Sequence, residues 1–170
     1  MPTSRSARAR NGKKLVIAFL YNVRHKYPDL EDPRTQLEID FDDPPCIKWI
    51  IKHLEKCGYS VIPVEANERA YQKLCRHKKD IDLAFNYSEG IYGHDRECQI
   101  PAILEMLQIP YLGSRPLTCA LVLDKAKAKE VLMSRGVPTA PFQVFESTKE
   151  KRRTSLKYPL IVKPLSQGSG

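Results

Sequence analysis

A polar loop punctuated by glycines is the first place in this sequence where chemistry is expected. It follows an apolar segment and reads YSEGIYGHD over residues 87–95. The preceding asparagine and the serine and glutamate of the loop offer hydrogen-bonding groups and a carboxylate, and the glycines allow a ligand to approach the backbone closely. The candidate substrate-binding residues are therefore Asn86, Ser88, Glu89 and Gly90. A polar connector with capping residues fits the composition equally well, so both interpretations stay open.

A second candidate is the pair Asp124 and Lys125, at the expected start of a helix. Asp124 can cap free backbone N–H groups, whereas Lys125 is a cation at the end of the helix dipole that disfavours it. A bound phosphate would remove that conflict, because the lysine and the N–H groups could face it together. Spacing alone favours a solvated surface lysine, since Lys127 and Lys129 lie nearby.

A third candidate lies near the end of the chain, where Lys163 closes the apolar segment 160–162 and precedes a glycine- and serine-rich stretch. A lysine at the end of a strand, beside flexible N–H donors, suits a nucleotide phosphate. The stretch is neither a P-loop nor a GxGxxG motif, so a strand-edge lysine beside a solvent loop is the alternative. The candidate nucleotide-binding residues are Lys125, Lys163, Gln167, Gly168, Ser169 and Gly170.

The histidines and cysteines form no recognised catalytic or metal-binding set. The four histidines match no serine or cysteine nucleophile motif. The five cysteines are odd in number, widely spaced and without a CxxC pair, which favours reduced thiols over a disulfide framework or a zinc site. No metal ligand is predicted in the chain.

The elements that position these candidates alternate between strands and helices. Apolar runs predict strands of a parallel sheet at residues 15–20, 59–64, 81–86 and 109–112. Amphipathic spacing and capping residues predict helices around residues 47–58, 68–76, 100–107, 117–123 and 124–135. This alternation is typical of a doubly wound α/β sheet, which binds ligands at the carboxyl ends of its strands.

Two further segments follow a different pattern. Residues 22–45 are polar, acidic and without periodicity, which predicts a long loop of the kind that is usually functional or mobile. After Pro138 the composition changes, and two strands are predicted at residues 142–145 and 160–162.

Composition bounds the class of protein. A chain of 170 residues with 42% hydrophobic residues suffices for one domain and part of another. The net charge is +8, and the basic residues cluster at residues 5–14 and 149–153. The first cluster belongs largely to a tail over residues 1–13, which is expected to be disordered or to serve as a targeting address. Abundant acidic residues between these clusters argue against a nucleic-acid partner. No apolar run approaches the roughly 18 residues of a membrane span, which predicts a cytoplasmic protein without membrane contact.

Residues 82–139 resemble the D-alanine–D-alanine ligase family of the ATP-grasp superfamily, through DLAFNYSEGIYGHDRECQ, IPYLGS, LDK-x-K and GVPT in this order. PLIVKPLSQGSG at residues 159–170 adds to the resemblance. The resemblance implies an α/β fold: a parallel-sheet, Rossmann-like pre-ATP-grasp domain over residues 14–114, then the start of an ATP-grasp α+β nucleotide-binding domain over residues 115–170. In this family ATP phosphorylates a carboxylate, and an amine then attacks the acyl phosphate.

The same resemblance implies roles for the candidates. Lys125 and Lys163 fall on phosphate-binding lysines, residues 167–170 on a loop that closes over the phosphates, and residues 86–90 on the pocket of the first substrate. The implied ligands are ATP, Mg²⁺ with protein ligands beyond residue 170, and a small amino-acid or carboxylate substrate. A homodimer is implied by analogy alone.

Three departures from the family bear on these expectations. After the first strand the family has a glycine-rich loop with a serine and a glutamate that holds the first substrate's amine, whereas this chain continues YNVRH over residues 21–25. A different amino acid or carboxylate therefore suits the sequence as well as D-alanine. Residues 167–170 lack the family's acidic residue and second serine. The adenine pocket also lies beyond residue 170, so this portion alone is expected to be inactive; a non-catalytic binding or regulatory remnant is the alternative.

Overall fold

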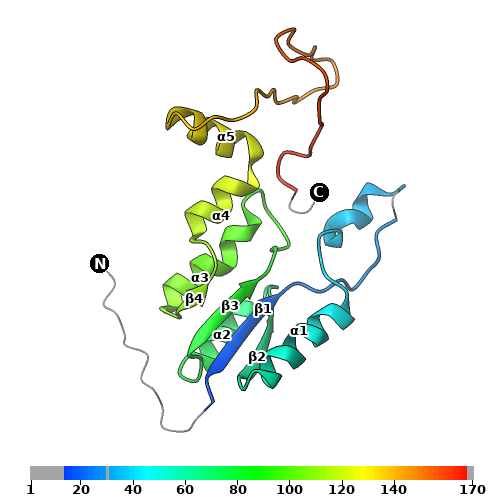
Figure 1. Ribbon diagram of the computed structural model, residues 1–170. Helices are drawn as coiled ribbons and strands as arrows, with labels where there is room; N and C mark the ends of the chain where they lie inside the picture. The colour runs from blue at the N-terminus through cyan, green and yellow to red at the C-terminus, as the bar shows by residue number, and fades with distance from the viewer. Residues whose placement is uncertain (1–13, 30, 168–170) are drawn as a thin grey trace.

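A four-stranded parallel sheet forms the centre of the molecule (Figure 1), in a computed structural model that describes residues 14–29 and 31–167. The strands are β1 (Val16–Tyr21), β2 (Ser60–Glu65), β3 (Leu83–Tyr87) and β4 (Tyr111–Leu112). They lie in the order β2-β1-β3-β4. The predicted parallel sheet is confirmed, with small shifts in the strand ends. The predicted basic tail, residues 1–13, lies outside the described residues.

The predicted helices are also present. They are α1 (Pro44–Lys56), α2 (Ala70–His77), α3 (Gln99–Leu107), α4 (Pro116–Leu123) and α5 (Lys125–Ser134). Two 3₁₀ helices accompany them, η1 (Pro33–Glu38) and η2 (Arg96–Cys98). In the described part of the chain, no helix is long and apolar enough to cross a membrane.

The core explains why β1 is central. Its side chains alternate between the two faces of the sheet, and both faces are covered, as expected of a strand with a continuous apolar run. Ala18 and Leu20 pack in one cluster with Leu74 of α2 and Leu104 of α3. Phe19 faces the other way and lies against the Phe85 ring, with the ring centroids 5.5 Å apart. Burying a side chain such as Leu20 contributes about 2 kcal/mol of transfer free energy.

The segment predicted as a long loop is more ordered than its composition indicates. It contains η1, and Val23 pairs with Asp42 in an isolated parallel bridge. The Arg24 backbone N–H also donates to the Asp42 carbonyl, over 2.8 Å. The loop therefore folds back beside the end of β1, because its two ends hydrogen-bond to each other.

The start of α5 follows the capping prediction. Asp124 Oδ1 accepts hydrogen bonds from the backbone N–H groups of Ala126 and Lys127, both over 2.9 Å. These bonds satisfy donors that the first helical turn leaves free. Lys125 is consequently the first residue of α5.

The two strands predicted after Pro138 are wrong. Residues 142–145 and 160–162 belong to an extended segment without strand or helix. Ile161 and Val162 are 83% and 94% exposed, so no apolar face covers them. A strand requires a neighbour for its backbone groups, and the apolar pattern alone does not supply one. Lys163 therefore does not end a strand, and it is exposed.

Candidate functional site

The strand order itself locates the candidate site. From β1 the chain reaches β2 on one side and later β3 on the other, so the order reverses between β1 and β3. In open parallel sheets ligands bind at such a switch point, outside the carboxyl ends of the strands. Leu20 and Tyr21 of β1 lie opposite Asn86 and Tyr87 of β3. The loops after β1 and β3 therefore leave the sheet side by side at this point.

Asn22 joins the strand ends. Its side chain is 3% exposed, and Nδ2 donates to the Ala66 carbonyl beyond β2 over 3.1 Å. Its Oδ1 accepts from the backbone N–H groups of Glu89 and Gly90, over 2.9 and 3.0 Å. One residue after β1 thus anchors the segments that follow both neighbouring strands.

The loop after β3 is shaped by short-range contacts. The Ser88 hydroxyl donates to Asn86 Oδ1 over 2.6 Å. Gly90 has φ +74°, and a Cβ there would lie 2.7 Å from the Arg96 carbonyl carbon, so only glycine fits without movement. In this conformation the Asn86 and Ser88 side chains bond to each other and stabilise the shape of the loop.

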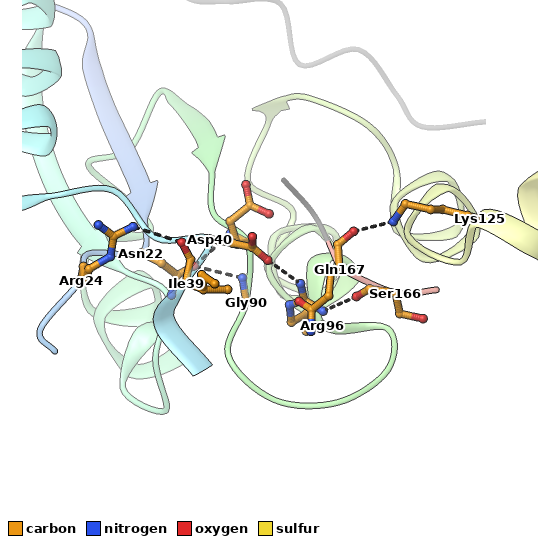
Figure 2. A network of polar contacts seen from close by, with 10 residues as sticks. Asn22, Arg24, Ile39, Asp40, Gly90, Arg96, Lys125, Ser166 and Gln167 are labelled. Atoms are coloured by element: carbon orange, nitrogen blue, oxygen red, sulfur yellow. Dashed lines mark hydrogen bonds and ion pairs between the residues drawn. The ribbon is translucent and has the colours of Figure 1, made fainter. Parts of the chain in front are cut away.

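Arg24 shapes the loop after β1. Its guanidinium donates to the backbone carbonyls of Glu38 and Ile39, over 3.3 and 3.0 Å, and pairs with Asp43 over 3.1 Å. Figure 2 shows Arg24 reaching toward Ile39, next to Asp40. These bonds hold the returning part of the loop, and with it Asp40, close to the loop after β3.

Arg96 connects this loop to the end of the described chain. It pairs with Asp40 over 3.3 Å, and the two side chains are 13% and 8% exposed. Its other terminal nitrogen donates to the Ser166 carbonyl over 2.8 Å (Figure 2). Arg96 therefore bridges two segments that are far apart in sequence.

Lys125 reaches the same end of the chain from α5. Its Nζ donates to the Gln167 carbonyl over 2.6 Å, and its backbone N–H donates to the Leu165 carbonyl over 3.2 Å. A cavity of about 390 Å³ lies between this segment and the loop after β3. It is lined by Gly93, His94, Arg96, Pro164, Leu165, Ser166 and Gln167.

Carboxyl groups outnumber cations around Arg96. Burial raises the pKa of Glu89, and the nearby carboxylates of Glu97 and Asp40 raise it further, while Arg96 opposes the shift. Burial likewise raises the pKa of Glu97, against the opposing effects of Arg96 and Lys125. Arg96 and Lys125 thus partly offset the mutual repulsion of these carboxylates, each of which is harder to ionise beside the others.

Tyr87 is fixed at the edge of the same site. A hydrogen bond to Asp42 and burial raise the pKa of Tyr87 to about 12. The phenol therefore stays protonated at neutral pH and acts as a donor.

The structure brings together most of the residues predicted from sequence. Residues 86–90 lie at the β1/β3 switch point, and Arg96, which packs on Gly90, joins them to Ser166. Lys125 contacts the neighbouring Gln167, whereas Lys163 is exposed and makes none of these contacts. The predicted Gly168, Ser169 and Gly170 lie outside the described residues. Sequence reasoning missed four residues that organise the site, namely Asn22, Arg24, Asp40 and Arg96.

His25 gives the start of the β1 loop a pH-dependent contact. Its Nε2 lies 2.6 Å from Glu65 Oε1, and this hydrogen bond raises the pKa of His25, with a further contribution from Glu38. A raised folded-state pKa means that the contact stabilises the protein below the ordinary pKa of 6.5 and is lost as pH rises through the raised value. His25→Gln should therefore lower the free energy of unfolding more at about pH 6 than at about pH 9, in urea titrations.

His77→Gln, at the end of α2, is the matched control for that comparison. It removes a histidine from outside the β1 loop. An equal loss from His25→Gln at both pH values would show that the charged form of His25 contributes nothing.

Several known proteins similar to this chain belong to one family. No protein-family model matches the chain. The chain is similar to the D-alanine–D-alanine ligase of Geobacter sulfurreducens, with 38% identity over 122 residues, which cover 71% of this chain and 37% of the relative. It is also similar to D-alanine–D-alanine ligase B of Brucella suis, with 36% identity over 116 residues, covering 68% and 36% of the two chains.

A solved structure agrees with the sequence comparisons. The D-alanine–D-alanine ligase of Bacillus anthracis complexed with ATP matches with a TM-score of 0.58 and 28% identity, over 89% of this chain and 48% of that one. The parallel α/β sheet and these similarities assign the chain to the ATP-grasp superfamily. Within that superfamily its homologues are the D-alanine–D-alanine ligases, whose N-terminal portion it matches. The chain spans less than half the length of these relatives.

Proposed function

We propose that the chain forms the substrate-facing portion of an ATP-dependent ligase that joins the carboxylate of one small molecule to the amine of another. The carboxylate oxygen takes the γ-phosphoryl group of ATP, and ADP leaves. The amine nitrogen then attacks the acyl carbon, phosphate leaves as the new C–N bond forms, and the nitrogen releases a proton. The observation that carries the proposal is the meeting of the loop after β3 with Lys125 and residues 165–167 at the switch point. Similarity to the D-alanine–D-alanine ligases supports it.

Lys125 is the proposed phosphate ligand. Its ammonium group lies at the N-terminus of α5 and now donates to a neutral carbonyl, that of Gln167. A phosphate oxygen is a stronger acceptor than a carbonyl and would also gain from the positive end of the helix dipole. Residues 167–170 and the exposed Lys163 are proposed to complete the phosphate site.

The loop after β3 is the proposed amino-acid site. The Glu89 carboxyl is crowded by Asp40 and Glu97, which raise its pKa. The ammonium group of an amino acid would offset that repulsion between carboxylates. Glu89 is therefore assigned to the amine, with Asn86, Ser88 and Gly90 shaping the loop that presents it.

Two further parts of the proposal concern organisation. Residues 14–114 are assigned to a pre-ATP-grasp domain and residues 115–170 to part of the nucleotide-binding domain, because α4 begins directly after that division. A homodimer is proposed by analogy. Among the described residues no group of three or more His, Cys, Asp or Glu side chains is placed to hold a metal ion, so no residue here is assigned to Mg²⁺.

Phosphate binding to the purified chain tests the central assignment. Lys125→Met should weaken the affinity for tripolyphosphate, which probes the phosphate contacts without adenine, about tenfold, because a charge-assisted hydrogen bond is lost. Titration calorimetry measures this without requiring turnover. Lys127→Met is the matched control, since Lys127 is two residues away and pairs with Glu130 instead. Equal affinities of the two variants would contradict the assignment.

A further inference from the structure

Asn22 holds two successive peptide groups of the proposed amino-acid site and is itself buried. Its three hydrogen bonds leave no ambiguity about the orientation of the amide, because the backbone N–H groups of Glu89 and Gly90 only donate and the Ala66 carbonyl only accepts. Figure 2 shows Asn22 pointing toward Gly90. With 3% of its surface exposed, Asn22 acts through this backbone.

The held peptide is confined from two sides. Asn22 accepts hydrogen bonds from the N–H groups of Glu89 and Gly90, and the backbone of Arg96 packs so closely on Gly90 that a Cβ does not fit. The Glu89 side chain leaves this fixed backbone and lies within electrostatic reach of Arg96 and Asp40. The position of the Glu89 carboxyl therefore depends on where Asn22 holds the peptide.

We propose that Asn22 is a positioning residue that sets the Glu89 carboxyl for the ammonium group of an amino-acid ligand. The ligand-contacting role of Glu89 rests on the function proposed above. The inference adds that the residue after β1 determines binding through two backbone bonds to a loop 67 and 68 residues away in sequence. In this proposal the residue after β1 fixes the backbone of the loop after β3 and does not contact the ligand.

Two substitutions separate the acceptor of Asn22 from its donor. Asn22→Ala removes all three bonds, so the Glu89 and Gly90 amides should exchange with deuterium about tenfold faster or more. The affinity for D-alanine, the probe used, should fall about tenfold for the same reason. Asn22→Asp keeps an acceptor for both amides, but it loses the donor to Ala66 and places a carboxylate at a position that is only 3% exposed. It should keep the Glu89 and Gly90 amides protected from exchange.

Asn67→Ala is the matched control. Asn67 lies beside Ala66, and its side chain accepts from the Arg69 backbone N–H in the loop after β2. This variant should leave exchange at Glu89 and Gly90, and D-alanine affinity, at the wild-type values.

The two measurements distinguish failure of this inference from failure of the proposed function. Asn22→Ala with protected Glu89 and Gly90 amides, or with unchanged affinity, overturns the positioning role. If Asn22→Ala does not fold, exchange in the wild-type protein decides, because Glu89 and Gly90 amides that exchange as freely as exposed amides would overturn the inference. If wild-type protein does not bind D-alanine while Glu89 and Gly90 are protected through Asn22, the proposed ligand fails and the ligand-positioning role falls with it.

Discussion

Gly90→Ala should destabilise the protein by about 3 kcal/mol, one of the largest effects expected for a single added methyl group here. Part of the loss comes from the backbone, because Gly90 has φ +74°, a conformation that costs an L-residue about 1 kcal/mol. The rest comes from contact, since the new Cβ would lie 2.7 Å from the Arg96 carbonyl carbon. Backbone, unlike the end of a flexible side chain, cannot move aside cheaply.

Gly136→Ala measures the backbone contribution alone, so the difference between the two variants gives the cost of the contact with Arg96. Gly136 has φ +70°, close to that of Gly90, but a Cβ there meets nothing within 4 Å. Its substitution should cost only about 1 kcal/mol. Urea unfolding of both variants measures the difference. Equal losses would mean that the loop after β3 relaxes freely, and that Arg96 does not confine the Gly90 peptide.

The sheet was predictable because its signals are local. The apolar run at residues 15–20 predicts a buried strand, and β1 occupies nearly the same residues at the centre of the sheet. Asp124 predicts a helix start through its capping chemistry, and it accepts hydrogen bonds from two free N–H groups of the first turn. Each of these inferences needs only a few neighbouring residues.

The position of the loop after β3 was predictable for a topological reason. Parallel strands bring their carboxyl ends to one edge, so a polar loop after residue 86 had to lie at that edge of the sheet. By contrast, the pairing of Arg96 with Asp40 joins residues 56 positions apart. Neither residue carries a local pattern that names its partner, and the composition of the segment around Asp40 indicates only a loop.

The two strands predicted after Pro138 failed for a related reason. An apolar run such as residues 160–162 describes which side chains prefer burial, but strand formation also requires a paired backbone. In the described residues no strand lies beside that run, and Val162 is 94% exposed. Lys163, which follows this run, therefore does not lie at the end of a strand, although its assignment from sequence depended on that position.

Arg96→Met should lower the free energy of unfolding by about 3 kcal/mol, because it leaves the carboxylate of Asp40 buried without this cation. Asp40 and Arg96 are 8% and 13% exposed, so water compensates poorly for the loss. The bond to the Ser166 carbonyl is lost as well. In a double-mutant cycle with Asp40→Asn, the combined loss should be smaller than the sum by about 1 kcal/mol or more.

The pH dependence of that loss tests the electrostatic cause. Arg96 lowers the pKa of Glu89 and of Glu97, which burial raises, so its removal should raise both pKa values further. When the pKa of a carboxyl is higher in the folded state than in the unfolded state, the protein loses stability as pH rises above the unfolded-state pKa, because the unfolded state ionises more easily. The deficit of Arg96→Met should therefore be smaller at about pH 4.5 than at about pH 7.

Arg115→Met is the control for an exposed ion pair. Arg115 pairs with Glu105 over 3.9 Å, with 83% of the arginine side chain exposed. Its removal should change stability by no more than about 0.5 kcal/mol. If Arg96→Met costs equally little, or costs the same at both pH values, then Arg96 does not hold the two loops together by charge. Asp40 would then owe its place to the bonds that Arg24 makes to the backbone on either side of η1's end.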